Sequence, residues 1–243
     1  GQRLTKGIAV ESLKGCGVIY ITSGAEFAID ACASAQSVRE HVPGLQIDIY
    51  CDVPEQIPQG IFDQVHPIEN PHKRSKVDYI DKSRFERVLY LDSDTRIIAD
   101  VSDLFGLLDR FEICMCHAHS RERASTNQTW RTVIPRCFPQ LNSGVFLFQN
   151  SPSVQEMFRK WAAAYHSANF NSDQVTLREL VWLSNLRLFV LPPEYNIRYA
   201  KYLEVWDDHE AHPKILHYPE YKSKESKKLK DVVKGFFGGR SRA

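Results

Sequence analysis

The stretch that decides the fold is Val88-Leu89-Tyr90-Leu91-Asp92-Ser93-Asp94-Thr95, where an apolar run stops abruptly at two carboxylates. Short apolar runs rich in Val, Leu and Tyr predict a buried strand. Aspartate is depleted in strand interiors and costly to bury unpaired, so Asp92 and Asp94 are expected at the strand end, where open α/β sheets bind ligands. Two carboxylates there indicate a hard cation. Because Asp-x-Asp pairs also arise by chance, the rest of the chain must support this interpretation.

The residues before this stretch predict alternating strands and helices. Apolar runs predict strands at 18–21 and 47–51, and periodic apolar positions predict helices at 26–42 and 78–85. This order predicts βαβ units, and therefore an α/β protein with a mostly parallel, doubly wound sheet.

After the acidic pair the pattern becomes less regular. We expect a short helix at 101–108 and strands at 111–115, 145–148 and 186–191. Two further helices should begin after Ser151-Pro152 and Ser172, because serine is a favourable N-cap. Residues 120–140 form a long polar stretch with several arginines, and loops of this length are commonly functional.

Composition limits the classes of function. The chain has 243 residues, 43% of them hydrophobic and 25% charged, with a formal net charge of +1, which suits one globular domain and argues against a nucleic-acid partner. No apolar run reaches the roughly 18 residues of a membrane span. Six cysteines among 243 residues do not form the dense framework of a small secreted scaffold, which predicts a reducing, cytoplasmic setting. The start at Gly1-Gln2, without Met, is consistent with a piece of a longer protein.

The last residues differ in composition from the rest. Residues 222–243 contain eight Lys or Arg against Glu225 and Asp231. We therefore expect a domain at 1–220 and a basic C-terminal tail at 221–243. One interpretation of the tail is a solvated helix or frayed end; the other is a peripheral contact with an anionic membrane surface, anchored by Phe236-Phe237.

Three later segments accompany the acidic pair. Leu141-Asn142-Ser143-Gly144-Val145-Phe146 leads into a strand, Asn171-Ser172-Asp173-Gln174 opens a helix, and Lys214-Ile215-Leu216-His217-Tyr218 ends an apolar stretch in a histidine. In this order the four segments resemble the GT-A glycosyltransferases, most closely glycosyltransferase family 8 and its bacterial relatives. The resemblance covers residues 18–218 and implies a single domain with a GT-A (Rossmann-like) doubly wound mixed sheet.

The resemblance also implies a reaction. Members of the family move a sugar from a nucleotide-diphosphate donor to an acceptor hydroxyl, and a divalent cation stabilises the diphosphate leaving group as a Lewis acid. We expect a UDP-hexose donor, a carbohydrate or glycoconjugate acceptor bound against the 120–140 loop, and retention of the anomeric configuration. Asp92, Asp94 and His217 match the family's metal ligands, and this donor set suits Mn²⁺, with Mg²⁺ as the alternative. Taken alone, His217 is equally typical of a structural histidine.

The same resemblance assigns donor contacts. Tyr20 and Thr22 would contact the base or ribose, and Arg74 and Lys76 the phosphates. The remaining expected donor contacts are Asp92, Ser93, Asn142, Ser143 and Gly144.

Asp173 and Gln174 match the family's catalytic residues beside the reacting sugar carbon. Structural explanations compete here, because both residues also lie in a first helical turn, where the dipole favours a carboxylate. Likewise Asn142 and Gly144 suit a turn before a strand, and Arg74 and Lys76 suit a solvated basic turn.

One segment departs from the family. Its members commonly follow the metal histidine with a Gly after three residues, then a Lys after six and a Pro-Trp. Here His217 is followed by Tyr218-Pro219-Glu220-Tyr221-Lys222, which lacks the Gly and Pro-Trp and has its Lys one residue early. We expect Lys222 to replace the phosphate-binding lysine through a reshaped loop.

Three other functions compete. Asp92-Ser93-Asp94-Thr95 also resembles the nucleophile motif of haloacid dehalogenase-like phosphohydrolases, although that motif normally lies on the first strand. A nucleotidyltransferase would need a glycine-rich basic loop after the first strand, and a non-catalytic nucleotide-sugar binding domain would keep the fold.

A zinc site is suggested by Cys114, Cys116, His117 and His119. However, alternate residues of a strand point to opposite faces, which disfavours a single tetrahedral site.

Overall fold

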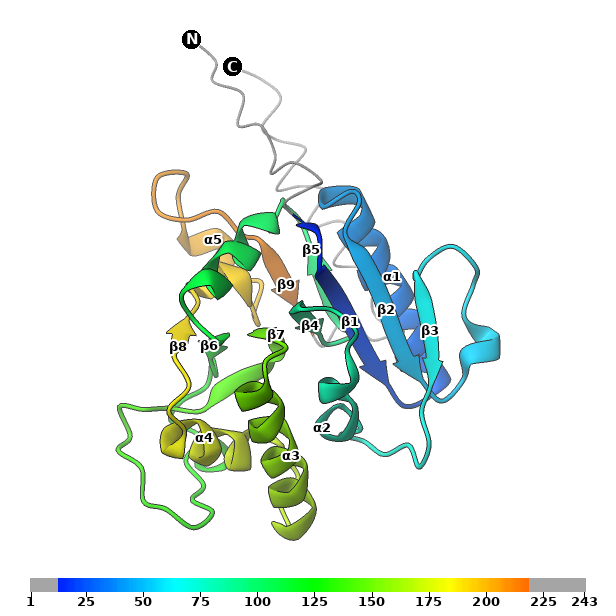
Figure 1. Cartoon of the computed structure of the whole chain (residues 1–243). Helices are drawn as coiled ribbons and strands as arrows, with labels where there is room; N and C mark the ends of the chain where they lie inside the picture. Colours follow the sequence, from blue (N-terminus) through cyan, green and yellow to red (C-terminus); the bar gives the residue numbers. More distant parts are fainter. Residues whose placement is uncertain (1–12, 219–243) are drawn as a thin grey trace.

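The computed structural model describes residues 13–218, which form a central mixed sheet covered by helices on both faces (Figure 1). The sheet has seven strands in the order β3-β2-β1-β4-β7-β6-β8, and β7 runs antiparallel to both neighbours. The strands are β1 (Cys16–Thr22), β2 (Gln46–Cys51), β3 (Gln64–Pro67), β4 (Arg87–Leu91), β6 (Ile113–His117), β7 (Leu141–Gln149) and β8 (Leu188–Val190). The predicted doubly wound mixed sheet is confirmed.

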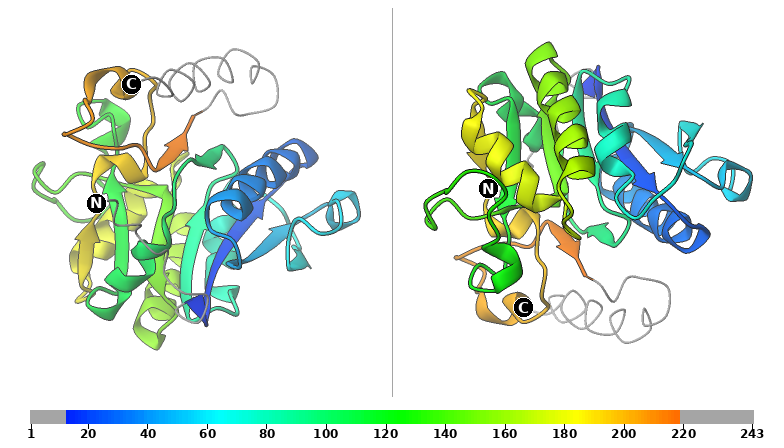
Figure 2. Two further views of the ribbon diagram at one scale, coloured as in Figure 1. Left: turned by 90° about the horizontal axis from the view of Figure 1, so that it is seen from above. Right: turned by 90° about the horizontal axis from the view of Figure 1, so that it is seen from below.

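Different helices cover the two faces (Figure 2). The α-helices are α1 (Ala25–His41), α2 (Lys76–Tyr79), α3 (Pro152–Ser167), α4 (Gln174–Leu183) and α5 (Tyr202–Val205). Short 3₁₀ helices occupy Pro54–Gln56, Ile80–Lys82, Ser102–Asp109, Ala124–Thr126 and Pro193–Tyr195. One apolar core joins α1 and the Ser102–Asp109 helix to the sheet, and a second joins α2, α3 and α4 to the opposite face. No helix within residues 13–218 has the length and hydropathy of a membrane span.

Local sequence explains the central elements. Every residue of β1 is buried, as expected for a parallel strand covered on both faces. At the start of α3, Val154 N donates to Ser151 Oγ at 3.4 Å, and Pro152 occupies the first turn, which confirms the predicted cap.

The short helix predicted at 101–108 is present as the 3₁₀ helix Ser102–Asp109. Several other predicted boundaries were wrong. The helix expected at 78–85 is the shorter α2 followed by a 3₁₀ turn. The N-cap position of α4 is Asp173 instead of Ser172. Because β7 already begins at Leu141, the Asn142-Ser143-Gly144 segment lies inside the strand.

Strand pairing brings the chemistry-bearing segments together. Because β7 is antiparallel to β4, its N-terminal half lies beside the C-terminal end of β4, and Asp92 N donates to Gly144 O at 2.8 Å. A second sheet pairs β5 (Thr95–Ile97) with β9 (Ile215–His217), and its register sets Thr95 opposite His217. The acidic pair is thus flanked by β7 and β9.

Candidate functional site

The cation cluster consists of Asp92, Asp94 and His217. Asp92 directly follows β4, Asp94 directly precedes β5, and His217 is the last residue of β9. One ligand atom of each residue lies within 4.8 Å of the others. His217 Nε2 is 3.2 Å from Asp94 Oδ1 and 3.6 Å from Asp92 Oδ2. Two carboxylates and one imidazole nitrogen form a donor set that fits Mn²⁺ or Mg²⁺.

A chain of hydrogen bonds fixes the tautomer of His217. The backbone N of Gly144 donates to Asn142 Oδ1 at 3.0 Å, so that atom is the amide oxygen. Asn196 Nδ2 donates to the same oxygen at 3.0 Å, which leaves Asn196 Oδ1 to accept from His217 Nδ1 at 2.8 Å. In the neutral ring Nε2 therefore carries a lone pair that faces a carboxylate. Two such groups repel unless a proton or a cation lies between them, so the arrangement fits a bound cation.

A glycine is required at position 144 because the backbone there lies very close to the side chains of His217 and Asp92. A Cβ added there would overlap Cε1 of His217 and would lie 2.7 Å from Asp92 Oδ2. Only a residue without a side chain lets β7 pass this close to two of the expected metal ligands.

Lys76 is a buried ammonium group between two carboxylates. The residue is 5% exposed; its Nζ donates to Asp92 Oδ1 at 3.0 Å and to Ser143 O at 3.3 Å, and lies 3.7 Å from Asp173 Oδ2. Burial opposes ionisation of Asp92, but the charge of Lys76 is the largest effect that favours it, and the pKa of Asp92 lies below its usual value. Asp92 is therefore ionised at neutral pH, as a metal ligand must be.

Asp173 and Gln174 both reach toward β7. Asp173 Oδ2 accepts from Ser143 Oγ at 2.8 Å, and Arg74 Nε lies 3.5 Å from its Oδ1. Gln174 Oε1 accepts from Ser143 N at 3.3 Å. The Asp173 side chain makes no capping bond to α4, so the helix dipole alone does not explain its position.

A cavity of about 120 Å³ opens beside the acidic pair, and its walls include Thr22, Arg74, Lys76 and Ser93. Thr22 Oγ1 is buried and has no hydrogen-bond partner among the described residues, which leaves it available to a ligand.

Tyr20 was a wrong prediction. It is completely buried between β1 and α1, where its hydroxyl is 2.8 Å from Ser34 Oγ. Tyr20 occupies the same strand face as Thr22 but lies two residues before the end of β1. At that point α1 covers the face, so Tyr20 cannot contact a ligand in the cavity.

Arg74 lies just before α2 and Lys76 begins it, and a cluster of His72, Asp78 and His166 holds this segment. The Nε2 atoms of His72 and His166 lie 2.5 Å and 2.7 Å from the two carboxylate oxygens of Asp78. Arg74 N donates to His72 Nδ1 at 3.2 Å, so Nε2 of the neutral His72 ring carries the proton that Asp78 accepts. This cluster links α2 to the end of α3 beside the cavity.

Two other predictions concern the zinc alternative and the basic tail. Cys114, Cys116, His117 and His119 do not belong to any group of metal-ligand atoms found among the described residues, and Cys116 Sγ instead donates to Pro192 O at 3.3 Å. Lys222 and the tail at 221–243 lie outside the described residues.

Sequence reasoning missed Asn196. It lies in no recognisable motif, yet it bonds both His217 and Asn142. The only available signal was its place after an apolar strand, which many structural asparagines share.

Comparison with known proteins extends these observations. The family model described as nucleotide-diphospho-sugar transferase matches residues 86–232, more than half of the chain, and this segment contains the acidic pair, the Asn142-Ser143-Gly144 segment and His217. No curated protein matches the chain. The match supports a GT-A-like glycosyltransferase superfamily, whereas membership of family 8 stays a prediction. The chain therefore belongs to the nucleotide-diphospho-sugar transferases.

Proposed function

We propose that this transferase moves a hexosyl group from a UDP-sugar to an acceptor hydroxyl, with retention of configuration and with Mn²⁺, or Mg²⁺, held by Asp92, Asp94 and His217. The observation that carries the proposal is the lone pair of His217 Nε2 facing Asp94 Oδ1 at 3.2 Å, within a protein of the nucleotide-diphospho-sugar transferase family.

The reaction makes one bond and breaks one at the anomeric carbon of the donor sugar. The acceptor oxygen bonds to the anomeric carbon, the bond from that carbon to the diphosphate oxygen breaks, and the nucleoside diphosphate leaves with the electron pair. The hydroxyl proton passes to a phosphate oxygen or to water. The cation, when bound, stabilises the charge that develops on the diphosphate.

The chain's own residues support this chemistry in four ways. Asn196 orients His217, and Lys76 keeps Asp92 ionised. Asp173 and Gln174 accept hydrogen bonds from Ser143, and in our proposal they would contact the donor sugar. Thr22 Oγ1 is available in the cavity for the nucleotide.

Because the chain belongs to the nucleotide-diphospho-sugar transferases, a transferase is favoured over the phosphohydrolase alternative. A nucleotide-sugar binding domain without turnover remains the second candidate, because it would use the same cluster. We also propose a cytoplasmic location and a peripheral membrane contact through the basic tail, which rest on cysteine usage and charge alone.

A donor screen tests the proposal. UDP-, GDP- and CMP-sugars are incubated with the protein and either Mn²⁺ or EDTA, and released nucleotide is measured. Mn²⁺-dependent release from a UDP-hexose is expected, and NMR of the product gives the anomeric configuration. Binding without release would favour the non-catalytic candidate, and the absence of both would contradict the proposal.

A further inference from the structure

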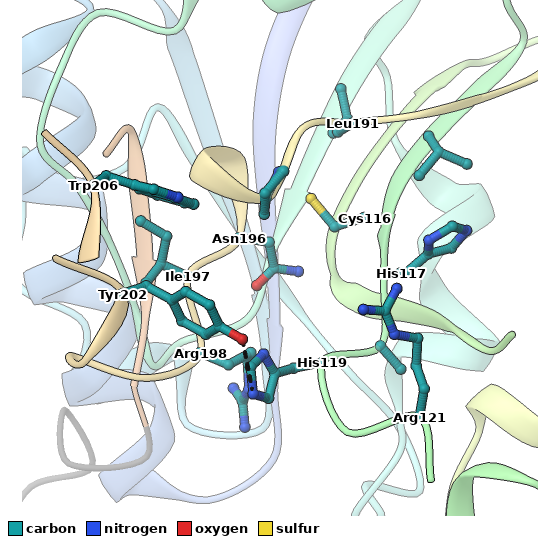
Figure 3. Close-up of a pocket in the computed structure, with 13 residues that line it drawn as sticks. Cys116, His117, His119, Arg121, Leu191, Asn196, Ile197, Arg198, Tyr202 and Trp206 are labelled. Carbon is teal, nitrogen blue, oxygen red and sulfur yellow. Dashed lines mark hydrogen bonds between the residues drawn. The ribbon is translucent and has the colours of Figure 1, made fainter. Parts of the chain in front are cut away.

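A second cavity, of about 300 Å³, has walls that include two residues hydrogen-bonded to His217 of the cation cluster. Figure 3 shows the residues that line it. It lies between the end of β6 and the segment that leads from β8 into α5. Asn196 lines this cavity and accepts the hydrogen bond of His217 Nδ1 at 2.8 Å. Arg198, also in the wall, donates from Nη1 to His217 O at 3.0 Å. A ligand in this cavity would therefore lie beside the cation cluster, and the volume falls within the usual range for small-molecule sites.

One wall of the cavity is aromatic. Tyr202 and Trp206 line it with ring centroids 5.9 Å apart, and the His119 ring lies 5.0 Å from that of Tyr202 (Figure 3). Tyr and Trp present an apolar ring face together with a polar edge. A sugar ring has the matching surface, because its C–H face is apolar and its edge carries hydroxyl groups.

The cavity is also strongly positive. Arg121 and Arg198 line it, no carboxylate does, and neither arginine makes an ion pair with another described residue. The pKa of His119 lies below its usual value, first because of burial and then because of Lys201, Arg121 and Arg198. A neutral His119 adds no charge, so the two guanidinium groups determine the sign of the field.

We propose that this cavity binds the acceptor, and that the acceptor is an anionic saccharide whose ring packs on Tyr202 and Trp206 while its carboxylate or phosphate pairs with Arg121 and Arg198. This inference rests on the proposed function, because the acceptor is the molecule to which the hexosyl group is transferred. Neutral sugars bind through hydroxyl groups and need no unpaired guanidinium, whereas bidentate pairing with an oxyanion is what arginine provides.

Three matched ligands test the charge. Affinity is measured by calorimetry, with UDP and Mn²⁺ present, for 4-nitrophenyl β-glucoside, 4-nitrophenyl β-glucuronide and 4-nitrophenyl β-glucoside 6-phosphate. At least one anionic probe should bind about ten-fold more tightly than the glucoside, the effect of one charge-assisted hydrogen bond. The carboxylate and phosphate probes separate the two sources of negative charge.

Three variants locate the effect. Arg121→Gln should remove the preference for the anionic probe, and Trp206→Ala should weaken every probe alike. Arg136→Gln, an exposed arginine of the same loop that pairs with Glu122, should change neither. Equal or tighter binding of the neutral glucoside, binding of none of the probes, or a preference that survives Arg121→Gln would overturn the inference. If the wild type shows no Mn²⁺-dependent UDP binding, that result would instead refute the proposed function.

Discussion

Gly144 lies so close to His217 that a methyl group on Gly144 would occupy the same space as the imidazole Cε1. Gly144→Ala should therefore displace His217 or Asp92 and reduce Mn²⁺-linked UDP affinity by at least about ten-fold, as changes next to a metal ligand commonly do. Calorimetric titration of UDP with and without Mn²⁺ measures this. Gly106→Ala is the matched control, because a Cβ there meets nothing within 4 Å and metal-linked binding should be unchanged. Unchanged binding in Gly144→Ala would show that the close approach of β7 to His217 is not needed for metal-linked binding.

Lys76→Met should leave Asp92 and Asp173 without their buried cation and destabilise the fold by about 3–5 kcal/mol at neutral pH. Because Lys76 helps to lower the pKa of Asp92, the stabilisation is fully present at neutral pH and is lost as the pH falls through that pKa. The stability difference between variant and wild type should therefore shrink toward acid pH, which urea unfolding at several pH values measures. Lys82→Met, at a side chain 57% exposed, should cost little at any pH. A deficit that grows toward acid pH would contradict this account.

Asn196→Ala should lower the affinity for Mn²⁺ by about 10–100-fold, because His217 loses the partner that fixes its tautomer and ring orientation. Manganese titration followed by electron paramagnetic resonance gives the affinity directly. Asn196→Asp keeps an acceptor for His217 Nδ1 and should retain more affinity than Asn196→Ala. If both variants bind Mn²⁺ like the wild type, Asn196 has only a structural role.

Glu179→Gln should loosen the 120–140 loop. The carboxylate of Glu179 is 2% exposed and accepts from Arg131 N, Thr132 N and Thr132 Oγ1 at 2.8–3.0 Å. Burial opposes its ionisation, but these hydrogen bonds outweigh it and hold its pKa below the ordinary 4.5. The variant should lose about 1–3 kcal/mol at pH 7.

The pH dependence of this effect has a definite sign. A depressed carboxylate pKa stabilises the fold above the unfolded-state pKa, and that contribution disappears as the pH falls below about 4. The wild type and Glu179→Gln should therefore converge in acid. Hydrogen exchange of residues 120–140 provides a local readout, and Glu156→Gln, on an exposed face of α3, serves as the control. A constant difference at all pH values would exclude the carboxylate as its source.

The central strands could be predicted because they carry short, mostly apolar runs. In β1, β2 and β4 these runs are buried, and their short length favours a strand over a helix. In contrast, β3 reads Gln-Val-His-Pro on an exposed sheet edge and β5 has only three residues, so neither carries a periodic signal. Their positions depend on pairing with strands that are distant in sequence.

The site was predictable only where a short segment carries the chemistry. The acidic pair, Gly144 and His217 lie together as expected, since each belongs to a local pattern. The contacts of Lys76 and Asn196 depend on tertiary packing over separations of 16 and 21 residues, which no local pattern records. Tyr20 shows the limit of strand alternation: it shares a strand face with Thr22, but α1 covers that face at Tyr20 and keeps its side chain from the cavity.

The most direct test of the central claim is the coupling between Mn²⁺ and UDP at the cation cluster. UDP affinity is measured in Mn²⁺ and in EDTA for the wild type, Asp94→Asn and the control Asp109→Asn, whose side chain is 64% exposed. Mn²⁺ should strengthen UDP binding at least about ten-fold in the wild type and in Asp109→Asn, and Asp94→Asn should remove this gain while remaining folded. Equal UDP affinity in Mn²⁺ and EDTA for the wild type, or a full Mn²⁺ effect in Asp94→Asn, would contradict the central claim.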